Sequence, residues 1–274
     1  MRSLFLAALL LAPVMPAAAQ TLDATTTQKL DAALTGAQRT PEERARDKDR
    51  RPKETLAFFG LRANMTVVEV QPGGGWWTDI LAPVLRDQGK LLVALNTNPN
   101  ANRQGLGATL SRMVAEPTVF DKVDVIDYGA SRGTALGPAN SADMVFVSRH
   151  MHGLIHNNLA PQAMTLFFAA LKPGGVLAIE QQRWPEGGAD PVKKPSWTSD
   201  YSAYVRESKV IALATAAGFR LAARSDISAN PRDTRDHPQD SWSLPPNFAG
   251  GDVDKAKFAA IGEADRMTLK FVKP

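Results

Sequence analysis

Short runs of β-branched and aliphatic residues alternate along the chain with stretches whose apolar residues recur at helical spacing. The clearest unit is the run 67–70, which leads into Pro72-Gly73-Gly74-Gly75 and then into helical spacing over 76–85. Similar patterns predict strands over 90–95, 123–126, 143–148, 176–180, 219–224 and 267–272, and helices over 103–114, 161–171 and 201–217. Such alternation is typical of a doubly wound, mainly parallel α/β sheet. We predict seven strands, with a turn over 172–175 before the fifth.

The N-terminus has the organisation of a secretory signal peptide. A positive start and an apolar run over 4–14 precede Ala17-Ala18-Ala19, an A-x-A cleavage site. Pro13 and Pro16 interrupt the run before it reaches the roughly 20 residues that a membrane-spanning helix needs. We therefore expect a signal peptide over 1–19 and a mature protein that is periplasmic or secreted, without stable membrane insertion.

A polar, alanine-rich segment separates this leader from the α/β pattern. Thr40-Pro41-Glu42-Glu43 has the spacing of a capping box with proline at the first helical position, which predicts a helix start. Acids and bases alternate over 42–53, and we interpret this run as a solvated helical face. The predicted organisation is a helical extension over 20–55 and an α/β domain over 56–274, with one long irregular loop over 228–251 folding toward the ligand pocket.

The composition excludes several kinds of functional site. The chain has no cysteine, which excludes a thiol nucleophile, a cysteine zinc site and a lipid anchor on a cysteine. Its 32 basic and 28 acidic residues are mixed throughout, so no nucleic-acid-binding surface is indicated. A small-molecule substrate is the expected partner, and the sequence does not define the oligomeric state.

Four motifs fall on the predicted strands and turns at consistent spacing. They are Val67-Val68-Glu69-Val70 with its glycine turn, Asp143-Met144-Val145-Phe146, Leu171-Lys172-Pro173-Gly174-Gly175-Val176-Leu177, and Ala216-Ala217-Gly218-Phe219. Together they resemble the class I S-adenosylmethionine-dependent methyltransferases, over roughly residues 50–274. The segments 51–56, 230–234 and 265–274 resemble, more narrowly, an exported "predicted methyltransferase" group. The resemblance implies a Rossmann-like methyltransferase fold, S-adenosylmethionine as cofactor and methyl transfer to an unknown small-molecule or envelope acceptor.

The resemblance also implies a set of cofactor-binding residues. Gln71 stands where the family has its first glycine, and Asn96 ends the strand where the family has an acid that binds the ribose hydroxyls. Asp127 matches the acid that faces the adenine amino group, with Tyr128 beside it as a stacking surface. The full set is Glu69, Gln71, Gly73, Gly74, Gly75, Trp77, Asn96, Asp127 and Tyr128.

Each of these residues also has a structural interpretation. Glu69 can cap the next helix or pair with an arginine, and Asp127 can form a turn before Gly129. Trp76 and Trp77 are more typical of core and rim packing than of cofactor contacts.

Three histidines cluster after the fourth predicted strand. If the strand continues, His150 and His152 share a face, whereas a helix would place His152 and His156 one turn apart. The alternatives are a pocket-lining or general-base role, a metal site and ordinary packing. We take His150 and His152 as the catalytic candidates, with His150 first, because an unperturbed imidazole titrates near pH 6.5. We predict no metal ligands.

Two other functions remain open from the sequence. The chain can be a non-catalytic periplasmic binding protein on a degenerate methyltransferase fold, which the departures at Gln71 and Asn96 favour. It can also be a metal-binding protein that uses His150, His152 and His156.

Overall fold

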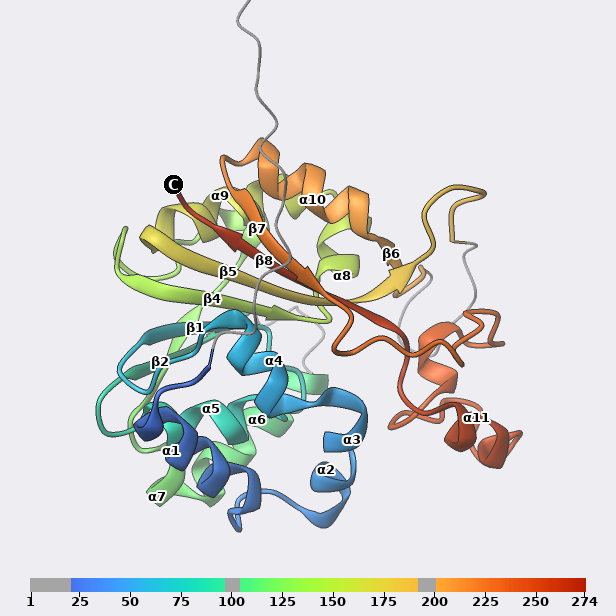
Figure 1. The fold of residues 1–274 in the computed structure, drawn as a ribbon, viewed down its shortest axis with the longest axis horizontal. Coiled ribbons are helices and arrows are strands. Elements are labelled where there is room, and N and C mark those ends of the chain that lie inside the picture. Colours follow the sequence, from blue (N-terminus) through green and yellow to red (C-terminus); the bar gives the residue numbers. More distant parts are fainter. Residues whose placement is uncertain (1–20, 97–103, 192–200) are drawn as a thin grey trace, which may run out of the picture.

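The computed structural model describes residues 21–96, 104–191 and 201–274, so the predicted signal peptide lies outside the described residues. Within these ranges the strands form one eight-stranded sheet in the order β3-β2-β1-β4-β5-β8-β7, with β6 paired to β5 (Figure 1). The strands are β1 (Thr66–Val70), β2 (Lys90–Leu95), β3 (Val123–Asp127), β4 (Ala142–Ser148), β5 (Leu171–Trp184), β6 (Val205–Arg206), β7 (Arg220–Ser225) and β8 (Arg266–Val272).

Strands β1 to β5 are mutually parallel, and β8 runs antiparallel to both β5 and β7. The carboxyl ends of the central strands therefore meet at one edge of the sheet. The prediction of a doubly wound, mainly parallel sheet is confirmed, and the seven predicted strands correspond to all of these except β6.

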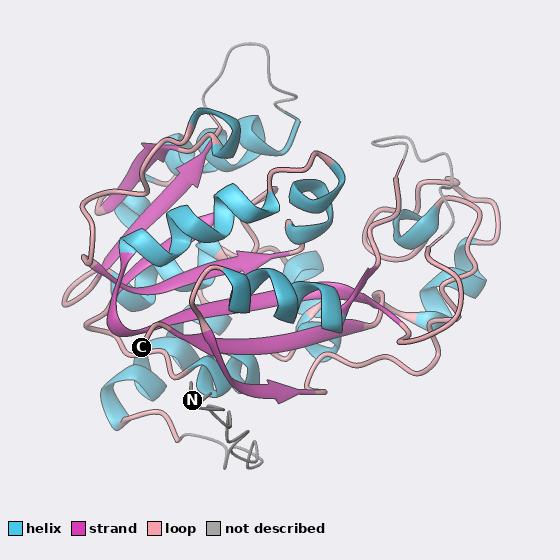
Figure 2. Cartoon of the chain, turned by 90° about the horizontal axis from the view of Figure 1, so that it is seen from above, coloured by secondary structure: helices cyan, strands magenta, loops and turns pink. Residues whose placement is uncertain are grey.

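Helices cover both faces of the sheet. In Figure 1 α8, α9 and α10 lie on one side, and α1, α4, α5, α6 and α7 lie on the other, while Figure 2 shows helices above the sheet from a second direction. The described α-helices are α1 (Ala24–Thr35), α2 (Pro41–Ala45), α3 (Asp47–Arg50), α4 (Pro52–Phe59), α5 (Thr78–Leu85), α6 (Gln104–Ala115), α7 (Pro117–Phe120), α8 (Met151–His156), α9 (Ala160–Ala170), α10 (Glu207–Ala216) and α11 (Lys255–Ile261). Among the described residues, no helix is long and apolar enough to span a membrane.

Two predicted boundaries were wrong. Strand β5 runs through 172–175 instead of starting after a turn, because the Gly174 amide donates to the Lys273 carbonyl and the Lys273 amide donates to the Gly175 carbonyl, which continues the pairing with the end of the chain. The helix predicted over 201–217 begins only at Glu207, because Val205 and Arg206 form β6 against β5.

The N-terminal segment is helical, as predicted, and only part of it is exposed to solvent. Thr40 and Glu43 form the predicted capping box, with Pro41 at the first helical position. The helix then breaks into α2, α3 and α4, with Arg51 in the left-handed region between the last two. Arg50 is buried whereas Glu42 and Lys48 are exposed, so the interpretation of 42–53 as a solvated face holds for only part of the run. Helix α4 crosses the predicted domain boundary at residue 55 and contacts β8.

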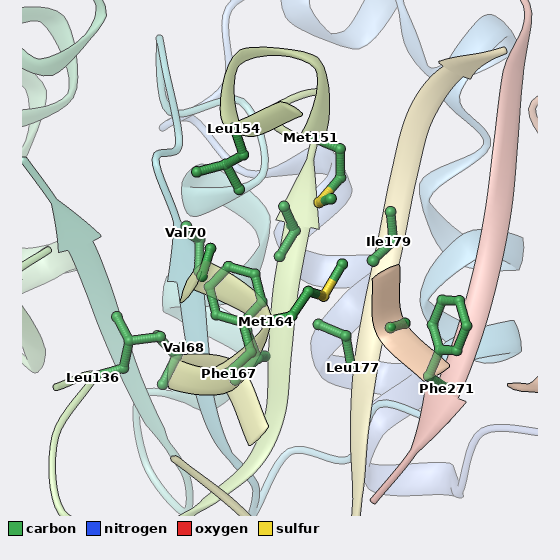
Figure 3. Close-up of a cluster of buried hydrophobic side chains, with 14 of the residues drawn as sticks. Val68, Val70, Leu136, Met151, Leu154, Met164, Phe167, Leu177, Ile179 and Phe271 are labelled. Atoms are coloured by element: carbon green, nitrogen blue, oxygen red, sulfur yellow. The ribbon is translucent and has the colours of Figure 1, made fainter. Parts of the chain in front are cut away.

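Two hydrophobic cores separate on the two sides of the sheet. Val68 and Val70 belong to one core, with Phe167 of α9, whereas Val67 belongs to the other, with Ile80 of α5. This alternation follows the two-residue period of a strand. Figure 3 shows the first core packed between α9 and the strands. Polar residues follow directly after β1, β2 and β4, namely Gln71, Asn96 and Arg149.

Candidate functional site

A cavity of about 850 Å³ lies at the carboxyl ends of β1, β2 and β4. Its volume is within the range of sites for small molecules and cofactors. The turn after β1 forms one wall, residues of α2 and α3 another, and the ends of β4 and β5 a third. The long loop 228–251 contributes Trp242, Pro246 and Asn247, which agrees with the predicted approach of this loop to the pocket.

The turn after β1 is open toward the cavity. Gln71, Gly73 and Gly75 all have positive φ angles (50°, 62° and 83°), so Gln71 adopts the left-handed backbone that a glycine would favour. A Cβ atom added to Gly74, which lines the cavity, would have no other atom within 4 Å. The Thr109 hydroxyl donates to the Gly73 carbonyl over 2.6 Å and fixes the turn against α6.

Gly75 has a different position. It does not line the cavity, and a Cβ atom there would lie 3.3 Å from Thr109 Oγ1. The predicted glycines thus divide into Gly73 and Gly74 at the cavity wall and Gly75 in the packing behind it.

Glu69 has both a structural contact with the next helix and a place in the cavity wall. Its carboxylate is 2% exposed and accepts a 2.7 Å hydrogen bond from the Thr78 hydroxyl, at the first residue of α5. It also lines the cavity. Burial raises the pKa of Glu69 to about 7, because the apolar surroundings disfavour the charged form.

Trp76 and Trp77, after the turn, belong to the hydrophobic core and also line the cavity. Their rings meet edge to face at 4.7 Å, and both are buried while lining the cavity. The Trp77 indole donates to Ser148 Oγ over 3.1 Å, and the Ser148 hydroxyl donates to Glu180 over 2.7 Å. Trp76 donates to the Glu43 carbonyl over 3.0 Å. The predicted packing role and the predicted site position are therefore compatible.

The ends of β2 and β3 are joined by an arginine that the sequence analysis missed. Arg132 donates through Nη1 to Asn96 Oδ1 over 3.2 Å and through Nη2 to both Asp127 oxygens over 2.7 Å. Asn96 lines the cavity as expected, but Asp127 does not. The expectation that Asp127 faces a ligand is thus not met in this geometry, because its carboxylate binds Arg132. The sequence signal that could have indicated this pair is the spacing of Asp127 and Arg132, which are five residues apart.

Tyr128 provides a buried aromatic wall. Its side chain is 2% exposed, and its hydroxyl has no hydrogen-bond partner among the described residues. Burial raises the pKa of Tyr128 above its ordinary value. The ring lies 6.3 Å from both the His150 ring and the Phe167 ring. Tyr128 lines the cavity, and its role as a stacking surface stays a prediction.

The histidines follow the helical alternative. Helix α8 begins directly after His150, and His150 and His152 line the cavity, while the His156 ring stacks on Tyr201 at 3.9 Å. His152 Nδ1 lies 3.2 Å from Gln181 Nε2. Among the described residues, no three His, Asp or Glu side chains are arranged to hold a metal ion.

Burial changes the acid–base character of the two candidate catalytic histidines. It lowers the pKa of His150 to about 4 and that of His152 to about 3. The expectation of an imidazole that titrates near 6.5 was therefore wrong, because the half-buried surroundings of both rings disfavour the charged form. Each is neutral at pH 7 and can accept a hydrogen bond from a substrate, but neither is a strong base.

A cluster of arginines and glutamates joins the start of the chain to its end, and the sequence analysis did not identify it. The Nε atoms of Arg46 and Arg50 donate to Glu263 over 2.6 Å and 3.0 Å. Arg266 pairs with Glu180 at 2.6 Å and with Glu263 at 2.7 Å. The three guanidinium groups that reach the cavity wall belong to Arg46, Arg50 and Arg149.

Solved structures similar to this chain include methyltransferases and a cyclase. A SAM-dependent methyltransferase from Aquifex aeolicus is 16% identical, with a TM-score of 0.56 over 93% of this chain and 100% of the other. Geranyl diphosphate C-methyltransferase from Streptomyces coelicolor A3(2) is 13% identical, with a TM-score of 0.57 over 89% and 88%. The [4+2]-cyclase SpnF is 16% identical, with a TM-score of 0.58 over 91% and 93%.

No family model and no curated protein matches the chain. The structural similarity shows that the chain has the fold of the class I S-adenosylmethionine-dependent methyltransferases. Because a cyclase has the same fold, the function must be argued from the site.

Proposed function

We propose that the protein binds S-adenosylmethionine in the cavity at the carboxyl ends of β1, β2 and β4 and transfers its methyl group to a small molecule. The observation that carries the proposal is the open turn at Gly73 and Gly74, facing an 850 Å³ cavity on a methyltransferase fold. Open α/β sheets bind ligands at this edge, where a glycine turn lets the backbone approach them.

The described residues fit such a cofactor. The backbone at Gly74 leaves open space, Asn96 lines the cavity at the end of β2, and the unpartnered Tyr128 hydroxyl and ring form part of the wall. Glu69, beside the turn, is positioned to favour the positive sulfonium when ionised. Gln71 does not obstruct this arrangement, because its backbone has the left-handed geometry of the missing glycine.

The cofactor supplies an electrophilic methyl group on a sulfonium, and transfer is an in-line displacement. The protein's part is mainly to hold the acceptor in line with that methyl group. His150 and His152, neutral at pH 7, can accept hydrogen bonds from an acceptor hydroxyl or amine. The buried Trp77 and Tyr128 rings exclude water from the same space.

Gly74 allows a direct test. Gly74→Val adds a side chain where the structure has open space, so its effect on folding is small while it fills part of the cavity. We expect S-adenosylhomocysteine to bind wild-type protein in calorimetry and to bind Gly74→Val at least tenfold more weakly, a loss of about 1.4 kcal/mol.

Gly250→Val is the matched control, because Gly250 lies outside the cavity wall and an added Cβ would have only a 3.7 Å contact. No binding of S-adenosylhomocysteine to wild-type protein at millimolar concentration contradicts the proposal, and so does equal binding by Gly74→Val.

We also propose that the mature protein acts in the cell envelope. Support comes from the signal-peptide pattern over 1–19. Expression of the full chain in a bacterium followed by mass spectrometry tests it, with an expected mature N-terminus at Gln20 in the periplasmic fraction. An unprocessed chain in the cytosolic fraction contradicts it.

A ligand-binding function without methyl transfer is the second candidate. Arg132 supports it, because its hydrogen bonds to Asn96 and Asp127 occupy the acceptor atoms where the family binds ribose and adenine. This candidate predicts that S-adenosylhomocysteine does not bind unless Arg132 is replaced, as in Arg132→Ala.

A further inference from the structure

Arg149 has an unusual environment for an arginine. It follows β4 directly, has a φ of 56° and lines the cavity. Its backbone amide donates to the Glu180 carbonyl over 2.8 Å, but its guanidinium forms no hydrogen bond or ion pair with any described residue. Its Nε is fully buried. The side chain as a whole is half-buried, so the buried Nε without a partner carries the cost, and an anion bound to the guanidinium reduces it.

The carboxylates near Arg149 already bind other arginines. Glu263 accepts from Arg46, Arg50 and Arg266, and Glu180 pairs with Arg266. The cluster therefore holds four guanidinium groups, counting Arg149, around two buried carboxylates, with Asp49 adding a more distant charge near Arg266. Burial, with the neighbouring arginines, lowers the pKa of Arg149. The cavity wall beside β4 and β5 is thus positively charged.

The remaining acids of the cavity do not neutralise this wall. Glu43 forms an ion pair with Arg112, and Glu69 lies at the β1 side with its pKa raised to about 7. Arg46 and Arg50 hydrogen-bond Glu263 through Nε alone, so their Nη groups are free of hydrogen bonds to other described residues.

The net charge of a ligand determines whether this wall attracts or repels it. S-adenosylmethionine carries one carboxylate against an ammonium and a sulfonium, so it is a net cation near neutral pH. Three guanidinium groups disfavour a cation and favour an anion, and oxyanions match the fork geometry of arginine. The aromatic side chains Tyr201 and Trp242 lie along the same cavity.

We propose that the methyl acceptor carries an oxyanion, a carboxylate or a phosphate, which Arg149 binds together with Arg46 and Arg50. The inference rests on the proposed function. The acceptor's anionic group enters at the β4–β5 side of the cavity, while the cofactor occupies the β1–β2 side. Binding of the anion neutralises the wall and strengthens binding of the cationic cofactor, which makes the two ligands cooperative.

Calorimetry with simple probes tests this. Benzoate and phenyl phosphate represent the two oxyanions, and benzamide is the neutral match for benzoate. We expect wild-type protein, saturated with S-adenosylhomocysteine, to bind benzoate or phenyl phosphate at least tenfold more tightly than benzamide. Arg149→Gln should lose about tenfold or more of the oxyanion affinity and leave benzamide unchanged. Arg149→Lys keeps the positive charge and should retain part of the oxyanion affinity.

Arg220→Gln is the control, because Arg220 is exposed at the opposite edge of the sheet. Equal binding of benzoate and benzamide overturns the proposal, as does an unchanged oxyanion affinity in Arg149→Gln. The comparison of the three probes on wild-type protein needs no variant, so the test stands even if a variant fails to fold.

The same variants distinguish the acceptor from the cofactor's own carboxylate. 5′-Methylthioadenosine lacks that carboxylate. If Arg149→Gln weakens S-adenosylhomocysteine but not 5′-methylthioadenosine, Arg149 binds the cofactor and the acceptor proposal is wrong. If S-adenosylhomocysteine fails to bind wild-type protein, the proposed function fails, whereas oxyanion binding to the free protein still tests the arginine site separately.

Discussion

At the scale of single residues, the site depends on where buried charges have partners and where they do not. Glu69 has one neutral partner, the Thr78 hydroxyl, while Arg149 has none among the described residues. Because desolvation disfavours both charges, each residue is sensitive to pH or to a bound ligand in a way that an exposed residue is not.

Glu69 should make stability fall as the pH rises. Its pKa in the folded protein is about 7 against an ordinary value of 4.5, so between these values folded protein holds a proton that unfolded protein releases. The resulting loss in the free energy of unfolding is about 3 kcal/mol from pH 4.5 to above pH 7. Glu69→Gln has no titrating carboxyl group at this position, so it lacks this pH-dependent part of the free energy of unfolding.

Urea denaturation of both proteins at pH 5 and pH 8 measures the difference. We expect the wild-type free energy of unfolding to decrease more than that of Glu69→Gln over this range. A parallel pH dependence in the two proteins would show that the folded pKa is ordinary.

Sequence reasoning found the residues whose roles depend on local order. Gly73 and Gly74 lie in the turn after β1 and Asn96 directly follows β2, and all three line the cavity. It missed the arginine cluster, because Arg46 and Glu263 are 217 residues apart and only tertiary folding brings them together. It also misjudged the histidine pKa values, since burial is not visible in a single sequence.

At the scale of elements, the strand–turn–helix unit around β1 positions the site. Helix α6 is tied to the turn by the bond from Thr109 to the Gly73 carbonyl, and α5 is tied to β1 by the bond from Thr78 to Glu69. The strand pattern was predictable because buried parallel strands have continuous apolar runs. Strand β6 and helix α11 were not, because two residues show no alternation and a seven-residue helix makes only about two turns.

Gly75 and Gly74 provide a matched pair of substitutions in this turn. Gly75→Ala requires a side chain at a φ of 83° and 3.3 Å from Thr109 Oγ1, so we expect a loss of about 1–2 kcal/mol in unfolding free energy. Gly74→Ala meets no atom within 4 Å and should stay within about 0.5 kcal/mol of wild type. Chemical denaturation compares them, and equal stabilities would mean that α6 does not restrict the turn.

At the scale of the whole molecule, Glu263 connects the first helices to the last strand. It binds Arg46 and Arg50 of the N-terminal segment and Arg266 of β8. These guanidinium groups outweigh the effect of burial and lower the pKa of Glu263. Its contribution to stability is therefore present above about pH 4.5 and is lost as the pH falls below that value.

Glu263→Gln should destabilise the protein by about 3–5 kcal/mol, because it leaves three buried or half-buried guanidinium groups without this carboxylate. Asp31→Asn, which breaks an exposed pair with Lys53, should cost less than about 1 kcal/mol. Thermal and urea unfolding measure both. Similar losses in the two variants would show that the cluster does not hold the chain ends together.

The central claim concerns the whole molecule: that this fold binds a methyl-donor cofactor at the carboxyl ends of its central strands. A crystal structure of the protein grown with millimolar S-adenosylhomocysteine tests it most directly. The account predicts the ligand against the Gly73–Gly74 backbone, with one end toward Asn96 and Tyr128 and the sulfur on the Glu69 side of the cavity. A cavity without ligand at that concentration, or a ligand bound elsewhere, would contradict the account.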